Sequence, residues 1–467
     1  MSTPTPKTEI AHDEPDPLPA EEYGLTDAQI EKVHDALDQG DIAKVEETAQ
    51  ALHAADLADL IEELPADHRT TLLDTLGGAL DPEALSYLVA PVRQEVIEHI
   101  GPKGLAGALS ELESDDAVEI FEDLDEDFQQ RILTQLPVGY RLVLEEGIAF
   151  PEASAGRLMQ REVVVVPAGW TVGQTIDFMR SAQDMPEDFY DLFVVDPKHK
   201  CQGYVPLSRV LRARRPALIS EIMETDVRPI PFSTDQEEVA YLFRQYGLVS
   251  TPVVDDAGRV IGMITVDDIV HVIDEEAEDD LMKLAGLGES DLYGRVLATA
   301  RSRATWLTVN LGTAVFASLV IGLFEATLEQ IVALAVLMPI VASMGGNAGM
   351  QTLTVAVRAL AMKDLSATNA LRFIGKECLV GLSNGAVFAV MVGVVTWLWF
   401  GRVDIGVIIG LAMIINMLVA GLSGTLIPLA LEKLKIDPAV ASAIFLTTIT
   451  DVVGFFAFLG LAALFIL

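Results

Sequence analysis

The chain has 467 residues, 51% of them hydrophobic, yet its formal net charge is −38. The first 300 residues carry a net charge of −39 and the remaining 167 carry +1. An acidic polar part joined to an apolar part indicates a membrane protein. The negative electrostatic field of the acidic part repels phosphate, which excludes nucleic acid as a partner, and it attracts divalent cations.

Residues 1–24 are polar and rich in proline and contain no apolar core. We therefore predict a disordered N-terminus rather than a signal peptide, and we expect the acidic part to begin in the cytoplasm. The two cysteines, Cys201 and Cys378, lie far apart in the sequence and indicate neither a disulfide nor a cysteine metal site.

Residues 25–149 show apolar side chains at helical spacing, with acids between them and Pro or Gly between segments. The pattern also repeats, because the segments 55–64 and 114–124 match in character. Repeated helix pairs stack on one another in solenoids. We therefore predict an α-helical, solenoid-like N-terminal domain.

Residues 150–273 mix β-branched runs with helical stretches and contain a duplication. Val194-Val-Asp196 followed by Gly203 recurs as Val253-Val-Asp255 followed by Gly262, at an offset of 59 residues. These two copies, 150–217 and 218–273, resemble a tandem pair of α/β CBS domains, a module that often binds adenine nucleotides.

The CBS resemblance also implies a nucleotide site. Thr265 and Asp268 fit the signature whose Asp holds a nucleotide ribose, whereas the first copy has Arg209 in place of that Asp. The resemblance therefore implies one adenine nucleotide, such as ATP, for the CBS pair.

Residues 274–300 are predicted to form a helical connector, and residues 301–467 a transmembrane domain of five helices. Each of the five apolar runs is long enough to cross a membrane: 304–324, 330–357, 378–401, 405–431 and 438–467. The short loops place eight Lys and Arg residues on one side and Arg402 alone on the other. By the positive-inside rule, the N-terminus is cytoplasmic and the C-terminus lies outside the inner (plasma) membrane.

Asp451 is the only ionisable residue between Pro438 and Leu467, deep in the last apolar run. An unpaired carboxylate at this depth is costly, so it should face water, a partner or a cation. Thr447 and Thr448 lie on the same helical face, which suits a pore wall. The alternative is a protonated, hydrogen-bonded structural Asp.

The second apolar run contains Pro339, paired glycines and Asn347 near its middle. This composition predicts a broken helix whose freed carbonyls could coordinate an ion. Close packing of helices through small residues explains the glycines equally well.

These motifs resemble the MgtE family closely. That family carries a Pro followed, after five residues, by Gly-Gly-Asn-x-Gly-x-Gln, and a last helix that follows Asp-Pro-Ala and holds an Asp that binds hydrated magnesium on the pore axis of a homodimer. The matching residues are Pro339, Gly345, Gly346, Asn347, Gly349, Gln351, Asp437 and Asp451.

The resemblance extends over nearly the whole chain and implies further magnesium ligands. In the family, acids of the N-terminal helices, the second CBS domain and the connector, or plug, helix bind Mg²⁺ and close the pore. The corresponding residues are Asp115, Glu119, Glu237, Asp268, Glu276, Asp279 and Asp280, with Asp437 at the cytoplasmic mouth. Considered singly, each acid could equally be a solvated surface charge. His271, Arg244 and Gly247 depart from the family pattern, so fewer metal sites are expected.

The sequence therefore predicts a non-enzymatic, homodimeric, magnesium-selective channel that admits Mg²⁺ and is closed by cytoplasmic Mg²⁺, with ATP as a modulator. A cation-coupled carrier is the alternative, because broken helices and a buried carboxylate serve carriers as well. A membrane enzyme is disfavoured, since no transmembrane His or paired acids suggest hydrolytic chemistry.

Overall fold

The computed structural model describes residues 24–182, 185–186, 189–287, 296–366, 368–439 and 442–466. The predicted disordered terminus, apart from Gly24, and residues 288–295 of the predicted connector lie outside the described residues. The described chain forms two compact units. The first ends at Ser233 and also includes Pro252–Met263, and the second contains Thr234–Thr251 and everything from Ile264 onward.

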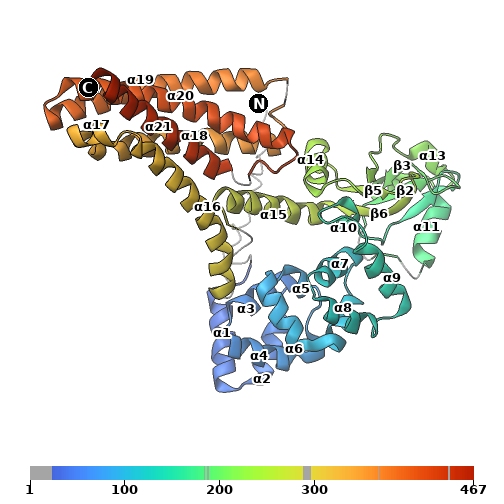
Figure 1. Cartoon of the computed structure of the whole chain (residues 1–467). Coiled ribbons are helices and arrows are strands. Elements are labelled where there is room, and N and C mark those ends of the chain that lie inside the picture. The colour runs from blue at the N-terminus through green and yellow to red at the C-terminus, as the bar shows by residue number, and fades with distance from the viewer. Residues whose placement is uncertain are drawn as a thin grey trace, which may run out of the picture. The chain divides into compact units, whose positions relative to one another are not determined.

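The first unit begins with an array of short helices (Figure 1). They are α1 (Asp27–Gln39), α2 (Ile42–Gln50), α3 (Ala54–Glu63), α4 (Ala66–Leu76), the short 3₁₀ helix η1 (Gly77–Ala79), α5 (Ala84–Tyr87), α6 (Ala90–Leu109), α7 (Ser114–Glu122), α8 (Glu126–Leu133) and α9 (Val138–Gly147). Helices α2, α4, α6 and α8 pack in one row, and α3, α5, α7 and α9 in another. This two-row stacking is the predicted solenoid-like arrangement.

The sequence repeat corresponds to two equivalent helix pairs, α3–α4 and α7–α8. Local signals fix the helix ends: Thr26 and Gln29 form a capping box before α1, and Gly40 ends α1 in the left-handed conformation. Apolar side chains facing inward from both rows, including Leu60, Phe121 and Ile132, are completely buried. Their burial stabilises a domain whose surface is strongly acidic.

The α/β part contains two small sheets of the same order. Its elements are α10 (Ala155–Leu158), β1 (Val165–Pro167), α11 (Val172–Ser181), β2 (Asp191–Val195), β3 (Cys201–Pro206), α12 (Leu207–Arg212), α13 (Ile219–Ile222), β4 (Ile230–Pro231), α14 (Gln236–Tyr246), β5 (Ser250–Val254) and β6 (Val260–Thr265). The strand orders are β1-β2-β3 and β4-β5-β6, with β1 and β2 parallel, β4 and β5 parallel, and β2 and β3 antiparallel. The duplication read from the sequence is therefore a structural duplication.

The equivalent positions 203 and 262 are both glycine for the same structural reason: another backbone segment passes too close for a side chain. A Cβ on Gly203 would lie 2.3 Å from the backbone oxygen of Glu224, and one on Gly262 would lie 2.7 Å from that of Gln160. Both distances are far below contact distance, so only glycine admits the crossing backbone at this point of each copy.

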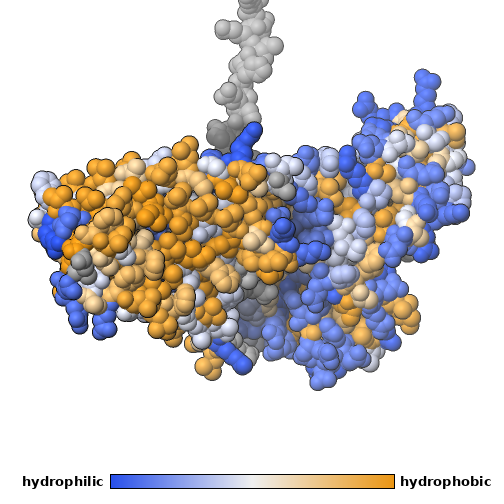
Figure 2. Space-filling model, turned by 45° about the horizontal axis from the view of Figure 1, so that its top comes forward, coloured by the Kyte–Doolittle hydropathy of each residue, from blue (hydrophilic) through white to orange (hydrophobic). Residues whose placement is uncertain are grey.

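The second unit contains the long helices. They are α15 (Val266–Leu284), α16 (Val296–Gly322), the short α17 (Glu325–Gln330), α18 (Ala333–Ala361), α19 (Ala370–Phe400), α20 (Val403–Lys433) and α21 (Ser442–Phe465). Judged by length and composition, five of these could each cross a membrane: α16 from Thr299, α18, α19, α20 and α21. In Figure 2 the visible side of this helical bundle is largely hydrophobic. Exposed apolar residues of these helices include Leu319, Val390 and Leu398. Such an apolar outer surface suits contact with lipid.

Two sequence expectations differ from the structure. The connector does not start a new helix at residue 274, because α15 runs without interruption from Val266 to Leu284. The predicted break in the second apolar run is wrong as well, because α18 continues through Pro339 and the paired glycines. A proline removes only one backbone donor, and neighbouring helices can support the local distortion of a membrane helix.

Candidate ion pathway and its acidic entrance

Asp451 lies in the middle of α21, about 14 Å along the helix from Ser442 at 1.5 Å per residue. Its side chain is half-buried, and within the described part of the chain no hydrogen bond or ion pair joins its carboxylate to another residue. A carboxylate in an apolar helix without a partner is poised to meet a cation or water. The arrangement gives no support to the alternative of a hydrogen-bonded structural Asp.

The threonines preceding Asp451 satisfy their own donors within α21. The Thr447 hydroxyl donates to the Ala443 carbonyl at 3.0 Å, and the Thr448 hydroxyl donates to the Ile444 carbonyl at 2.7 Å. Both oxygens therefore keep lone pairs that can accept hydrogen bonds from the water shell of a passing ion.

The small residues of α18 separate into two faces. Gly345 and Gly349 are buried: a Cβ on Gly345 would lie 2.2 Å from Asn416 Nδ2, and one on Gly349 would lie 2.8 Å from Leu446. These glycines therefore serve close helix packing, the alternative that the sequence left open. Asn347 and Gln351 are exposed on another face of the same helix, while Gly346 has open space around it.

Asn416 is a buried polar residue that the sequence analysis missed. It is completely buried in α20, its Nδ2 donates to the Val341 carbonyl at 2.9 Å, and its Oδ1 has no partner in the described structure. Gly454 packs against the same amide, since a Cβ on Gly454 would lie 2.7 Å from Nδ2. The signal was present, because Asn416 is the only side-chain amide in an otherwise apolar run.

Glu377 is a buried carboxylate in α19, and both of its oxygens have partners. Its Oε2 accepts from the Thr352 hydroxyl at 3.1 Å, and its Oε1 lies 3.3 Å from Lys376 Nζ. Glu377 therefore differs from Asp451, which has no such partners.

An acidic cluster lies where α15 meets the segment before α21. Lys283 Nζ is 2.6 Å from Asp437 Oδ2 and also contacts Asp279, so an ammonium group bridges the two carboxylates. Partial burial lowers the pKa of Lys283, but hydrogen bonds and charge attraction from Asp279 and Asp437 outweigh burial and raise the pKa above its usual value. Lys283, which the sequence analysis missed, therefore holds the place that a divalent ion could occupy.

The remaining acids of this cluster repel one another. The pKa of Glu237 is raised to about 7, first by partial loss of hydration and then by the charges of Glu276 and other carboxylates. The side chain of Glu237 still contacts solvent. Desolvation and Asp437 raise the pKa of Asp280 to about 6. The second unit thus brings together five of the predicted ligands, which we call the acidic entrance: Glu237, Glu276, Asp279, Asp280 and Asp437. Carboxylates held together at this cost attract protons or divalent cations.

Comparison with known families accounts for most of the chain. The family described as "Divalent cation transporter", MgtE, matches residues 338–461; the "MgtE intracellular N domain" matches 52–153; and CBS domains match 155–215 and 219–275. The magnesium transporter MgtE of Thermus thermophilus is 34% identical over 75% of this chain and 78% of its own length. The chain belongs to the MgtE family of magnesium transporters. The magnesium transporter MgtE of Enterococcus faecalis is also 34% identical to this chain, over 69% of this chain and 71% of its own length.

Among solved structures, the cytosolic domain of the Mg²⁺ channel MgtE in complex with ATP covers 52% of this chain and 99% of that domain, with 33% identity and a TM-score of 0.49. Both relatives are named as magnesium transporters, which is a transport function and not an enzymatic one. The family assignment made from the Gly-Gly-Asn and Asp-Pro-Ala motifs is therefore confirmed.

The two acids expected to bind metal in the MgtE N domain have different surroundings. Asp115 is buried in the first turn of α7. Glu119 accepts from Arg93 at 2.7 Å, and the same guanidinium reaches Asp123 at 2.7 Å. Burial lowers the pKa of Arg93, but the attraction of Glu119 and Asp123 outweighs burial and raises the pKa above its usual value. The arginine therefore stays charged. A metal ion at Glu119 would compete with this arginine for the carboxylate.

Asp268 has a local structural role in this MgtE-family chain. Its Oδ2 accepts from the Thr265 hydroxyl at 2.9 Å and from the Thr265 backbone N–H at 3.3 Å, which caps α15. Desolvation and the neighbouring Asp267 raise the pKa of Asp268 to about 6. The position predicted for ribose or metal binding is thus also a helix cap.

Two residues that depart from the MgtE pattern have structural explanations. Gly247 ends α14 at φ +61°, a left-handed conformation that glycine adopts without strain. Arg244 contacts the Met362 sulfur and lies over the Tyr241 ring, while Lys363 pairs with Glu238 at 3.3 Å. Contacts of these side chains connect α14 to the loop after α18. His271 is exposed on α15.

Proposed function

We propose that this MgtE-family protein is a magnesium-selective channel that mediates Mg²⁺ influx across the inner (plasma) membrane. The observation that carries the proposal is the Asp451 carboxylate, half-buried within an apolar helix without a partner in the described structure. A fixed negative charge at this depth attracts a hydrated divalent ion more strongly than a monovalent one. The hydroxyl oxygens of Thr447 and Thr448 supply acceptors for its water shell.

We propose that the pore forms between two copies of the chain. Ser343, Asn347 and Gln351 follow one another at four-residue intervals and are all exposed on one face of α18. A polar stripe of this kind is costly against lipid, so it should face water or a partner helix. A homodimer in which the stripes line a shared, water-filled path satisfies this requirement. The family resemblance implies that Asp451 of both copies lies on the axis of that path.

The gate is proposed to be the acidic entrance together with the N-domain acids Asp115 and Glu119. At low cytoplasmic Mg²⁺ the carboxylates of Glu237, Glu276 and Asp280 repel one another and favour separation of α14 from α15. Magnesium neutralises that repulsion by bridging the acids, which would hold α14 and α15 together beside Asp437 more firmly than the Lys283 contact alone and close the channel. The N-terminus would be cytoplasmic and the C-terminus outside, since eight basic residues flank the helices on one side.

ATP is proposed as a second cytoplasmic ligand, bound by the CBS pair near Thr265 and Asp268. The Asp268 carboxylate uses Oδ2 for the helix cap, which leaves the other oxygen for a ribose hydroxyl. Calorimetry of the full-length protein with ATP tests this site: Asp268→Ala should weaken binding, and a wild-type protein that binds no ATP at millimolar concentration would remove ATP from the account.

The test of transport mode is electrical recording from the purified protein in a planar bilayer with Mg²⁺ as the permeant cation. A channel gives unitary currents that reverse at the Mg²⁺ equilibrium potential in the absence of any proton or sodium gradient. A cation-coupled carrier, the alternative function, gives no unitary currents, and its transport stops when the coupling gradient is removed. The second outcome would overturn the channel proposal while leaving magnesium transport intact.

A further inference from the structure

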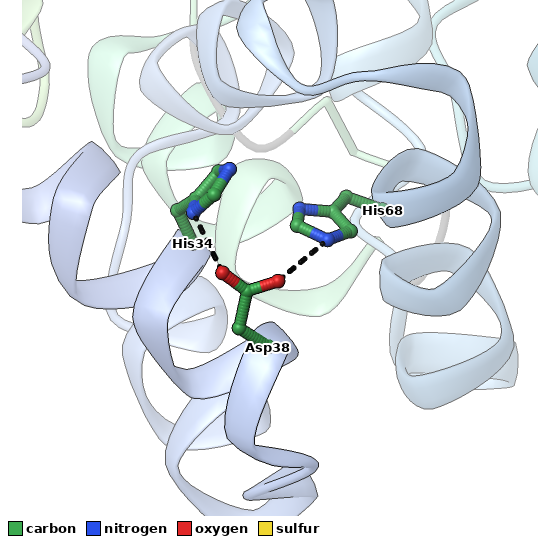
Figure 3. A group of neighbouring side chains, drawn as sticks. All are labelled: His34, Asp38 and His68. Carbon is green, nitrogen blue, oxygen red and sulfur yellow. Dashed lines mark ion pairs between the residues drawn. The ribbon is translucent and has the colours of Figure 1, made fainter.

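Two histidines and one aspartate meet on the N-terminal helices, outside every site described above (Figure 3). His34 and Asp38 lie one turn apart on α1, which places them on the same helical face, and His68 comes from the neighbouring α4. His34 Nδ1 is 3.4 Å from Asp38 Oδ2, and His68 Nε2 is 3.2 Å from Asp38 Oδ1. The imidazole rings are edge to face, with centroids 4.6 Å apart.

We propose that His34, Asp38 and His68 form a binding site for a divalent transition metal such as Zn²⁺ or Co²⁺. One ligand atom from each residue lies within 4.8 Å of the others. Ligands at about 2.1 Å from a tetrahedral ion lie about 3.4 Å from one another, and each oxygen of Asp38 lies at about this distance from one imidazole nitrogen: Oδ2 from His34 and Oδ1 from His68.

The chemistry of the ligands selects against magnesium. Mg²⁺ prefers oxygen ligands in octahedral geometry and keeps most of its water, whereas imidazole nitrogen favours Zn²⁺, Co²⁺, Ni²⁺ and Cu²⁺. Two imidazoles and one carboxylate leave at least one coordination position for water. The site therefore recognises metals that compete with magnesium, through ligands different from the acids proposed for gating.

Exposure and surroundings indicate reversible binding. The side chains of His34 and Asp38 are 44% and 57% exposed and that of His68 is 17% exposed, so an ion can enter without unfolding the helices. The buried Nδ1 of His68 has no hydrogen-bond partner in the described structure, and a ligating imidazole without such a partner binds metal more weakly. We therefore expect a site that fills and empties with the transition-metal concentration.

Two of the three ligands lie outside the segment matched by the family's N-domain model. That segment starts at residue 52, after His34 and Asp38, and it includes His68. The inference is also independent of the transport mode, because a carrier and a channel would carry the same three side chains. It adds a metal-binding property to the N domain that concerns transition metals alone.

Co²⁺ titration of the full-length, tag-free, metal-stripped protein tests the proposal. Excess Mg²⁺ is kept present to occupy oxygen-rich sites, and the visible absorption of nitrogen-coordinated Co²⁺ is recorded. We expect the wild type to develop this absorption with one Co²⁺ per chain, His68→Ala and His34→Gln to lose it, and Zn²⁺ to displace it. His99→Ala is the matched control, because His99 pairs with Asp74 at 2.9 Å on the same helical array, and no second histidine joins that pair among the described residues.

The outcomes are decisive in both directions. Absence of the absorption in the wild type, or its retention at unchanged affinity in the His34→Gln protein, would overturn the proposal and leave the three residues as a hydrogen-bonded pairing only. His34→Gln carries the test if the less exposed His68→Ala protein fails to fold, since His34 lies on the accessible side of the site. Circular dichroism of each variant verifies that its helices are intact.

Discussion

Replacing Lys283 by methionine should release α15 from the segment before α21 when Mg²⁺ is absent. The ammonium bridges Asp279 and Asp437, and all three side chains are about one-third exposed. Only the pair with Asp437 joins α15 to that segment, because Asp279 and Lys283 both lie on α15. Solvent screening limits this pair to about 0.5–1 kcal/mol, which corresponds to a change of about 2- to 5-fold in the ratio of attached to released helix.

Saturating Mg²⁺ should restore the attachment in the Lys283→Met protein, because a divalent ion can bridge the same carboxylates without competition from the ammonium group. Hydrogen exchange of the α15 backbone, measured by mass spectrometry with and without Mg²⁺, reports the attached fraction directly. Lys433→Met is the matched control, since Lys433 is exposed near the same segment and forms no ion pair among the described residues. Equal exchange of Lys283→Met and wild type without Mg²⁺ would refute the bridging role.

Three further predictions concern other parts of the chain. Lowering the pH from 8 to 6 should weaken Mg²⁺ binding at the acidic entrance about tenfold, because Glu237 has a pKa of about 7 and its carboxylate becomes protonated over this range. In calorimetry, Glu237→Gln should make Mg²⁺ affinity nearly independent of pH. A pH dependence that is unchanged in this variant would count against Glu237 as a ligand. Gly345→Ala should lower the free energy of unfolding by about 1–3 kcal/mol, because the new Cβ would overlap Asn416. The Cβ of Gly346→Ala meets no atom within 4 Å, so this variant should leave thermal unfolding unchanged. Equal effects of the two variants would contradict the close packing of Gly345 against Asn416. Arg93→Met should destabilise the N domain by about 2 kcal/mol, because two charged hydrogen bonds are lost. The same variant should bind Mg²⁺ more tightly at Glu119. Unaltered Mg²⁺ affinity in calorimetry would exclude competition between Arg93 and Mg²⁺ for Glu119.

Features with a local or periodic signal could be predicted from the sequence. The five long apolar helices, the repeated helix pairs and the duplicated sheets all follow from spacing, because hydrophobic periodicity and repeat offsets survive without knowledge of the fold. The reason for Gly203 and Gly262 could not be predicted, since the backbone that crosses each glycine comes from a distant segment. The family resemblance supplied the residues of the acidic entrance, which spacing alone would have left as surface charges.

The failures came from tertiary context. A proline with two glycines indicated a broken helix, but α18 stays continuous because neighbouring helices pack against its glycines. Lys283 had a visible signal, the four-residue spacing from Asp279, yet only the fold brings Asp437 to the same ammonium. Arg93 and Glu119 are 26 residues apart, and no sequence pattern predicts their pairing.

The central claim is that the Asp451 carboxylate selects the magnesium ion, and reversal potentials of wild type and Asp451→Asn in mixed Mg²⁺ and Na⁺ solutions test it most directly. The substitution keeps the size of the side chain and removes its charge, and Asp404→Asn, on the exposed end of α20 beside Arg402, is the matched control. We predict that Asp451→Asn loses the preference for Mg²⁺ over Na⁺ while remaining a folded dimer, and that Asp404→Asn keeps it. An Asp451→Asn protein with the selectivity of the wild type would contradict the account.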